Sequence, residues 1–186
     1  MPEGLMYLPL YVGKALHPDI NLGENYQSDD TGNNISAKNA YYSELTALYW
    51  LWKNNDSAYK GIVHYRRLLG SKQLKNRMSR DPYQRVIQEP ELSEILSQHD
   101  IVLAKKRNYY IESIYSHYAH TFHSERFDTC REVLIDLAPQ YVEAWDRLMH
   151  SRNAHVFNMF VMRQKKFDEY CAWLFPILFE LEKTEP

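Results

Sequence analysis

Three short apolar runs in the sequence each end in positively charged side chains. The three ends are His64-Tyr65-Arg66-Arg67, Lys105-Lys106-Arg107 and Arg163. The forked guanidinium groups of Arg66 and Arg67 suit phosphate oxygens, and on a strand only one of these two neighbours would face a given ligand. We therefore expect the three ends to converge on one anion. Salt bridges from Arg66 and Arg67 to loop carboxylates are the alternative interpretation.

Short polar side chains also crowd residues 29–36, directly before a helix that is predicted to start at Asn39. Hydroxyls, amides and free backbone N–H groups at a helix start can hold a ribose, a base edge or a phosphate. The same composition is typical of a cluster of turns and helix caps. The residues alone leave both interpretations open.

Three histidines, His117, His120 and His123, recur at every third position. Their spacing matches no strong zinc signature, and no nearby cysteine or carboxylate clearly completes a metal site. A role as base or as hydrogen-bond donor to a substrate is favoured over metal binding. Ordinary surface or capping histidines are the third interpretation.

Several signatures of other enzyme classes are absent from the sequence. It has no Gly-x-Gly-x-x-Gly, no phosphate-binding Gly-Lys-Ser/Thr loop and no serine nucleophile elbow, which argues against a dehydrogenase, an ATPase and a hydrolase. No Asp-x-Asp pair follows a predicted strand, so a divalent cation that holds a diphosphate is not expected.

Helical and extended patterns alternate along the chain. Predicted helices cover residues 39–52, 91–99, 111–120, 124–137, 139–150 and 165–182, and predicted strands begin at Lys60, Asp100 and Val156. Short apolar strands between helices indicate an α/β fold whose sheet is covered on both faces. Ligands of such sheets bind beyond the carboxyl ends of the strands, where the cationic segments stand.

Composition narrows the class of protein. The 186 residues predict one domain over 1–186, and the formal net charge of −2 argues against nucleic acid as a partner, although residues 72–85 are basic. Cys130 and Cys171 are expected to be free thiols of a cytoplasmic protein, and no apolar run is long enough to span a membrane. The 15 tyrosines suit either a surface that stacks bases or sugars or an aromatic core.

Ordered blocks along almost the whole chain resemble the bacterial family DUF4422. The blocks are Asp29–Asn39, Tyr42–Trp50, Gly61–Arg67, Tyr115–His123, Phe157–Met162 and Phe167–Phe175. The resemblance implies a glycosyltransferase with a GT-A-like, Rossmann-like nucleotide-binding fold. Its partners would be a nucleotide-sugar donor and a lipid-linked or oligosaccharide acceptor of capsular or exopolysaccharide synthesis, at the inner face of the membrane. Relatives have one more strand before residue 1 and a basic, aromatic tail after residue 186, so the domain is expected to be incomplete at both ends.

The resemblance and the strand-end argument together assign roles to residues. The donor-binding set is Asp29, Asp30, Thr31, Asn34, Ser36, Lys38, Asn39, Glu44, His64 and Tyr65. Arg66 or Arg67, with Lys105 or Arg107, would neutralise the leaving diphosphate without a metal or other cofactor. His117 or His123 would deprotonate or orient the acceptor hydroxyl, with Asp30 or Glu44 as the alternative base. The acceptor-binding set is His120, Asn158 and Met159.

One alternative comes from another class of protein. A non-catalytic glycan-binding or scaffold protein of a polysaccharide assembly system would use the tyrosines as stacking surfaces. It is expected to bind no nucleoside diphosphate, which distinguishes it from the enzyme.

Overall fold

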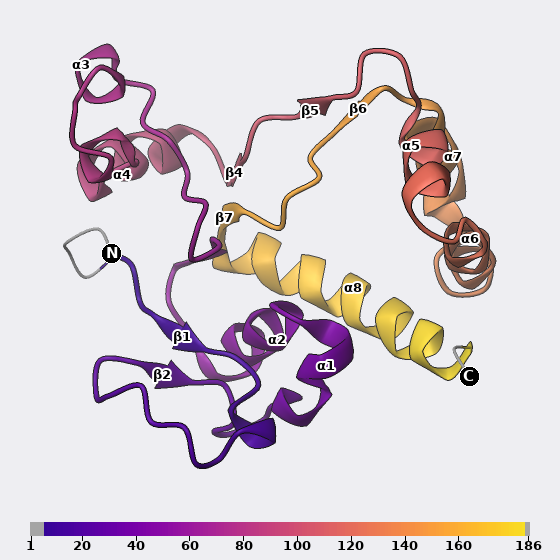
Figure 1. Cartoon of the computed structure of the whole chain (residues 1–186), viewed down its shortest axis with the longest axis horizontal. Helices are drawn as coiled ribbons and strands as arrows, with labels where there is room; N and C mark the ends of the chain where they lie inside the picture. Colours follow the sequence, from indigo (N-terminus) through magenta and orange to yellow (C-terminus); the bar gives the residue numbers. More distant parts are fainter. Residues whose placement is uncertain (1–5, 185–186) are drawn as a thin grey trace. The chain divides into compact units, whose positions relative to one another are not determined.

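The computed structural model describes residues 6–184, which form a mixed α/β fold (Figure 1). The predicted alternation of helices and strands is therefore confirmed. The chain separates into two compact units, one of residues 6–103 with 159–171 and the other of residues 104–158 with 172–184. The single domain over 1–186 stays a prediction.

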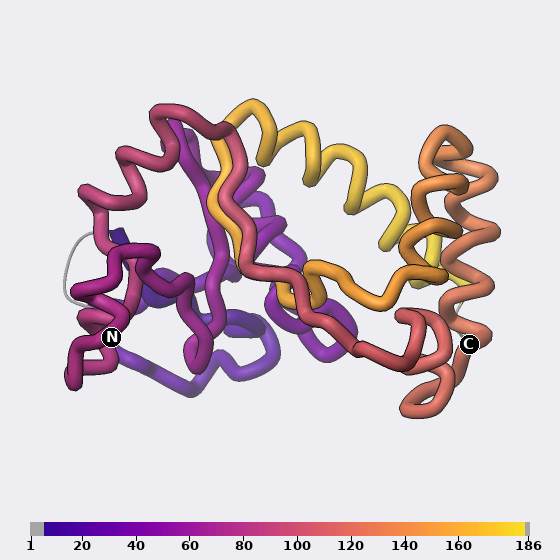
Figure 2. The backbone as a smooth tube through the Cα atoms, turned by 90° about the horizontal axis from the view of Figure 1, so that it is seen from above, coloured from indigo at the N-terminus to yellow at the C-terminus, as the bar shows by residue number. Residues whose placement is uncertain are grey.

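The main sheet of the first unit has the strand order β3-β7-β4, from β3 (Tyr59–Ile62), β7 (Phe160–Arg163) and β4 (Ile101–Leu103). Both outer strands run antiparallel to β7, and Figure 2 shows the β4 and β7 segments side by side. The central strand buries Phe160 and Met162. In contrast, Ile101 and Leu103 of β4 are 43% and 44% exposed, so the prediction that the sheet is covered on both faces is wrong for this strand.

Gly61 lets β3 approach β7 closely. It lies opposite Val161, and a Cβ atom on Gly61 would stand 2.4 Å from the backbone oxygen of Phe160. Contacts of this length do not occur between real Cβ atoms and a backbone oxygen, so a larger residue would force the strands apart.

The N-terminal part of the first unit is a set of short elements. It contains β1 (Leu10–Tyr11) and β2 (Gln27–Ser28), which pair in parallel, then η1 (Lys14–Leu16), η2 (Ser36–Lys38), α1 (Asn39–Tyr42) and α2 (Leu45–Asn54). The predicted helix over 39–52 is interrupted at Ser43, whose φ of 46° no helical residue adopts. The two halves therefore bury different faces: Leu48 is 1% exposed, whereas Tyr41 is 82% exposed.

The segment after β3 packs around a buried carboxylate. It contains α3 (Leu74–Arg77), η3 (Tyr83–Arg85) and α4 (Glu89–Gln98), which confirms the helix predicted over 91–99. Glu91 accepts hydrogen bonds at 2.6 Å from both the Ser71 hydroxyl and the Lys72 backbone N–H. These bonds tie the segment to the start of α4.

The second unit is mostly helical. Its elements are β5 (Arg107–Asn108), α5 (Ile114–Thr121), α6 (Glu125–Leu137), η4 (Pro139–Tyr141), α7 (Val142–His150), β6 (Asn153–Ala154) and the later part of α8 (Gln164–Thr184). Strands β5 and β6 pair antiparallel. Val133, Leu134, Ala138 and Ile177 form its buried core, against which Trp145 packs. The Ser113 hydroxyl caps α5 by accepting from the Ser116 N–H.

Both cysteines are free thiols, as predicted. Burial raises the pKa of Cys130 to about 11 and that of Cys171 to about 12, so both thiols stay protonated at neutral pH. Within residues 6–184, no helix has the length and apolar character that a membrane crossing requires.

Candidate functional site

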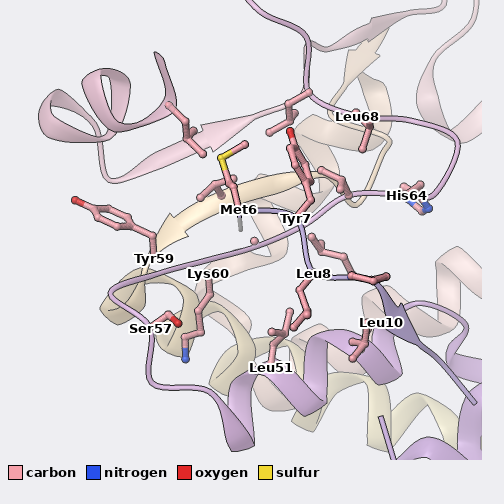
Figure 3. Close-up of a pocket in the computed structure, with 18 of the residues that line it drawn as sticks. Met6, Tyr7, Leu8, Leu10, Leu51, Ser57, Tyr59, Lys60, His64 and Leu68 are labelled. Carbon is pink, nitrogen blue, oxygen red and sulfur yellow. The ribbon is translucent and has the colours of Figure 1, made fainter. Parts of the chain in front are cut away.

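A pocket of about 840 Å³ lies in the first unit along β3. Its walls come from the N-terminal segment, α2, β3 with the turn that follows it, and α4. Figure 3 shows Leu8 and Leu10 of the N-terminal segment on the same side as Leu51 of α2, whereas the Tyr7 ring points the other way. The Tyr7 hydroxyl donates to the Ile87 oxygen at 3.2 Å. Its size is within the usual range for small-molecule sites, about 300–1,000 Å³.

The residues after β3 form a tight turn rather than the end of a strand. The His64 N–H donates to the Arg67 oxygen at 3.1 Å, and the Arg67 N–H donates to the His64 oxygen at 3.0 Å. The expectation that alternation along a strand would separate Arg66 from Arg67 is therefore wrong. Both side chains are exposed, and Arg66 lies 4.9 Å from the centre of the Tyr65 ring.

Three residues of the predicted donor-binding set line this pocket together: Glu44, His64 and Tyr65. Glu44 stands just before α2, and its carboxylate lies 4.0 Å from His64 Nε2. Tyr65 is 87% exposed at the tip of the turn, so most of its ring surface is accessible to a ligand. Polar groups and an exposed ring thus gather at the end of the pocket beside the arginines.

Asp29 and Ser36, also predicted to bind the donor, form a buried support for the N-terminal loops. Asp29 is completely buried and accepts from the Gly13 N–H at 2.9 Å, the Lys14 N–H at 3.2 Å and the Ser36 hydroxyl at 2.6 Å. The Ser36 hydroxyl in turn accepts from the Ala15 N–H at 3.1 Å. These contacts match the turn-and-cap interpretation of the loop.

The other predicted residues of the loop also bond within the protein. Asn34 donates to the backbone oxygens of Asp30 and Gly32, and the Thr31 hydroxyl accepts from the Trp50 indole at 2.9 Å. The Asn39 amide donates to the Ser43 oxygen at 2.7 Å. The exposed Asp30 accepts from the Ser28 hydroxyl, and Lys38 lies 5.9 Å from the Tyr42 ring centre. Their roles toward a donor stay predictions.

Lys60 is a buried cation of the pocket lining that sequence reasoning missed. Its side chain is 2% exposed, and its ammonium donates to the Asn55 oxygen at 3.0 Å and to Asp168 Oδ1 at 2.8 Å. It also lies 4.9 Å from the Phe167 ring centre. The one signal in the sequence is a lysine inside the predicted strand, a position where an unpaired charge would be costly.

Arg163 does not lie at the end of the sheet where the turn His64–Arg67 stands, so its predicted convergence with that turn is wrong. Because β7 is antiparallel to β3, Arg163 pairs with Tyr59 at the far end of the sheet from Ile62. Its guanidinium binds Asp100 at 2.6 Å, and hydrogen bonding to that carboxylate raises the pKa of Arg163. Lys105, Lys106 and Arg107 belong to the second unit and are exposed, and Arg107 lies 5.1 Å from the Tyr109 ring centre.

In the second unit, Glu112 joins two of the predicted histidines. Its carboxylate lies 2.9 Å from His117 Nδ1 and 2.5 Å from His120 Nδ1, and the Tyr109 ring centre lies 4.2 Å from that of His117. Sequence reasoning missed Glu112. The signal was its position just before α5, from which its side chain can contact His117 on the helix. Within residues 6–184, no hydrogen bond links the exposed His123 to Glu112.

Hydrogen bonds to His117 and His120 lower the pKa of Glu112 below its ordinary value of 4.5. A lowered folded-state pKa means that the stabilisation is present above that ordinary value and is lost as the pH falls through the folded pKa. We therefore expect Glu112→Gln to reduce thermal stability near neutral pH and to leave it unchanged in strong acid. Melting curves of both proteins from strong acid to neutral pH check the prediction. An equal loss of thermal stability in Glu112→Gln at every pH would contradict it.

The predicted acceptor residues Asn158 and Met159 lie before β7, not on it, so the strand predicted from Val156 begins later. Met159 is 6% exposed, inside the first unit, whereas Asn158 is the last residue of its segment in the second unit. Among residues 6–184, no group of three or more His, Cys, Asp or Glu side chains is arranged to hold a metal ion.

Comparison with known proteins places the chain in a family. The sequence profile of DUF4422, described as a domain of unknown function, matches residues 1–185. The chain therefore belongs to the DUF4422 family. No curated protein sequence matches it.

The chain is also similar to part of a solved structure. The apo structure of WbbM, a bifunctional glycosyltransferase, matches with a TM-score of 0.87 and 32% sequence identity over 99% of this chain. The match covers 35% of the WbbM chain, so this chain corresponds to about a third of that protein.

Proposed function

We propose that this chain is a glycosyltransferase that moves a sugar from a nucleotide-sugar donor to a capsular or exopolysaccharide acceptor. The similarity to part of WbbM over almost the whole chain carries the proposal. The pocket beside the arginine-containing turn supplies a site in which such a donor could be held. The proposal includes a GT-A-like fold and association with the inner face of the membrane, where lipid-linked acceptors are built.

In this proposal, the donor binds at the end of the first unit's pocket that Glu44, His64 and Tyr65 line. Tyr65 would stack on the base or the sugar, and Arg66 and Arg67 would bind the diphosphate. Negative charge develops on the diphosphate as the sugar leaves, and fixed cations stabilise that charge more than they stabilise the bound donor. The turn can therefore supply the stabilisation that GT-A-like enzymes usually obtain from a metal ion.

The base that activates the acceptor is proposed to be His117. Glu112 binds Nδ1 of His117, which fixes the ring and leaves Nε2 for the proton of an acceptor hydroxyl. Glu112 is thus a positioning residue. His123 and His120 stay proposed in their base and acceptor roles.

A metal-independent mechanism predicts that EDTA leaves transfer unchanged. The assay measures sugar transfer from a panel of nucleotide sugars to a lipid-linked glycan acceptor, with and without the chelator. Loss of transfer in EDTA that added Mg²⁺ or Mn²⁺ restores would contradict the metal-free step and leave the transferase proposal standing.

Arg66→Ala and Arg67→Ala test the diphosphate contact. The variant that removes a contacting arginine should weaken nucleoside-diphosphate binding by about 1.5–3 kcal/mol, the usual contribution of a hydrogen bond to a charged group. Arg80→Ala is the matched control, because Arg80 is an exposed arginine of the same unit outside the pocket lining. Equal affinity in all three variants would show that the turn does not hold the diphosphate.

A further inference from the structure

The second unit contains a separate pocket among α5, α6 and α7 that the proposed donor site does not use. Its volume is about 330 Å³, at the small end of the usual range for ligand sites. Tyr115 of α5, Asp128 and Arg131 of α6, and Trp145 and Asp146 of α7 line it. A site of this size suits one or two rings rather than a whole nucleotide sugar.

The aromatic wall of this pocket is held rigidly. Phe127 stacks on Tyr118 with ring centres 3.9 Å apart and planes 18° apart. Trp145 meets Phe127 edge to face at 5.6 Å, and it packs from behind against the buried core of the unit. The partly exposed indole is therefore fixed before any ligand arrives, which reduces the entropy lost on binding.

The polar wall carries donors and acceptors in fixed positions. Arg131 Nε and Nη2 bind the two oxygens of Asp146 at 2.7 and 2.8 Å, and the Tyr115 hydroxyl lies 3.2 Å from both oxygens of Asp128. Arginine has five N–H donors and each carboxylate has several lone pairs, so both pairs keep capacity for a ligand. Hydrogen bonding to Arg131 lowers the pKa of Asp146, which keeps this pair charged.

These two walls define the chemistry of the ligand. Two carboxylates, one arginine and His150 line the pocket. Arg131 is already paired with Asp146, so the permanent charges of the lining do not favour a phosphate or another anion. A flat indole beside closely spaced carboxylate and guanidinium groups suits a neutral ring with an apolar C–H face and hydroxyls around its edge. Pyranose sugars have this combination of surfaces.

We propose that this pocket is a saccharide-binding subsite of the second unit. Trp145 covers the C–H face of one sugar residue, and Asp128, Arg131 and Asp146 bind its hydroxyls. Binding here requires neither a nucleotide nor transfer, so the proposal goes beyond the proposed function. Only the identification of this saccharide as part of the acceptor glycan rests on that function.

Saturation-transfer NMR tests the proposal with the methyl glycosides of glucose, galactose and mannose, without any nucleotide. At least one glycoside should bind saturably and shift the indole N–H resonance of Trp145. Asp128→Asn should weaken that binding about tenfold, since a hydrogen bond to a charged group is lost. Trp145→Phe should weaken it as well while it retains an aromatic side chain against the core.

Glu143→Gln is the matched control, because Glu143 lies on α7 with its side chain 86% exposed and outside the lining. It should leave binding unchanged. Absence of saturable binding by all three glycosides, or binding that neither Asp128→Asn nor Trp145→Phe weakens, would overturn the subsite. Glycoside binding in a chain that transfers no sugar would support the subsite and refute the transferase function. Sugar transfer without glycoside binding would support the transferase function and refute the subsite.

Discussion

We expect Asp29→Ala to lower the free energy of unfolding by about 3–5 kcal/mol, because it leaves buried hydrogen-bond donors without an acceptor. The N–H of Gly13 and the hydroxyl of Ser36 lose their acceptor, and each unsatisfied buried group costs about 1–3 kcal/mol. Such a loss is a large part of the 5–15 kcal/mol that typically stabilises a domain. Urea denaturation followed by circular dichroism measures it.

Asp30→Ala is the control, since the neighbouring Asp30 is exposed and its removal should change stability by less than about 0.5 kcal/mol. This pair of variants also distinguishes the two interpretations of the loop over residues 29–36, donor binding and a structural support of turns and caps. If Asp29→Ala retained full stability but lost nucleotide binding, the side chain would serve the donor and the support role would be wrong.

Gly61→Ala should be the second most damaging change, with a loss of about 3 kcal/mol or more. The added Cβ meets a backbone oxygen of the neighbouring strand, which cannot rotate away as a flexible side chain could. Relief requires a shift of β3 against β7, and the turn at His64 would move with it. We expect a lower midpoint in urea and weaker nucleoside-diphosphate binding in the fraction that remains folded.

Gly70→Ala provides the comparison for Gly61→Ala. A Cβ on Gly70 would have its nearest neighbour at 3.8 Å, an ordinary contact, so this variant should be close to neutral. Equal stability of the two variants would show that the close approach of β3 and β7 does not limit this position.

The sequence predicted the elements better than their arrangement. Helix α4 was recognisable because Leu92 and Leu96 recur at helical spacing and are both buried. The break at Ser43 was not, since its φ depends on tertiary contacts and Tyr41 still fits the apolar period. Strand direction could not be predicted from the sequence. Arg163 was expected beside the His64–Arg67 segment, but β7 runs antiparallel to β3, so Arg163 lies at the opposite end of the sheet from Ile62.

The candidate site was partly predictable for a similar reason. His64 and Tyr65 follow a strand and do line the pocket. Lys60 and Glu112 were missed because their meaning depends on partners: Asp168 lies 108 positions from Lys60, and Glu112 acts only once α5 brings His117 and His120 to one side. Patterns within one segment reveal which face is buried, whereas pairs between segments become visible only in the folded chain.

Calorimetric titration of the whole chain with UDP, GDP and CDP in the presence of EDTA tests the central claim most directly. We predict saturable binding of at least one of the three nucleoside diphosphates. This binding should be lost in the double variant Arg66→Ala, Arg67→Ala and retained in Arg80→Ala. Absence of binding by all three nucleoside diphosphates, with and without added Mg²⁺, would contradict the account and favour a glycan-binding protein without transferase activity.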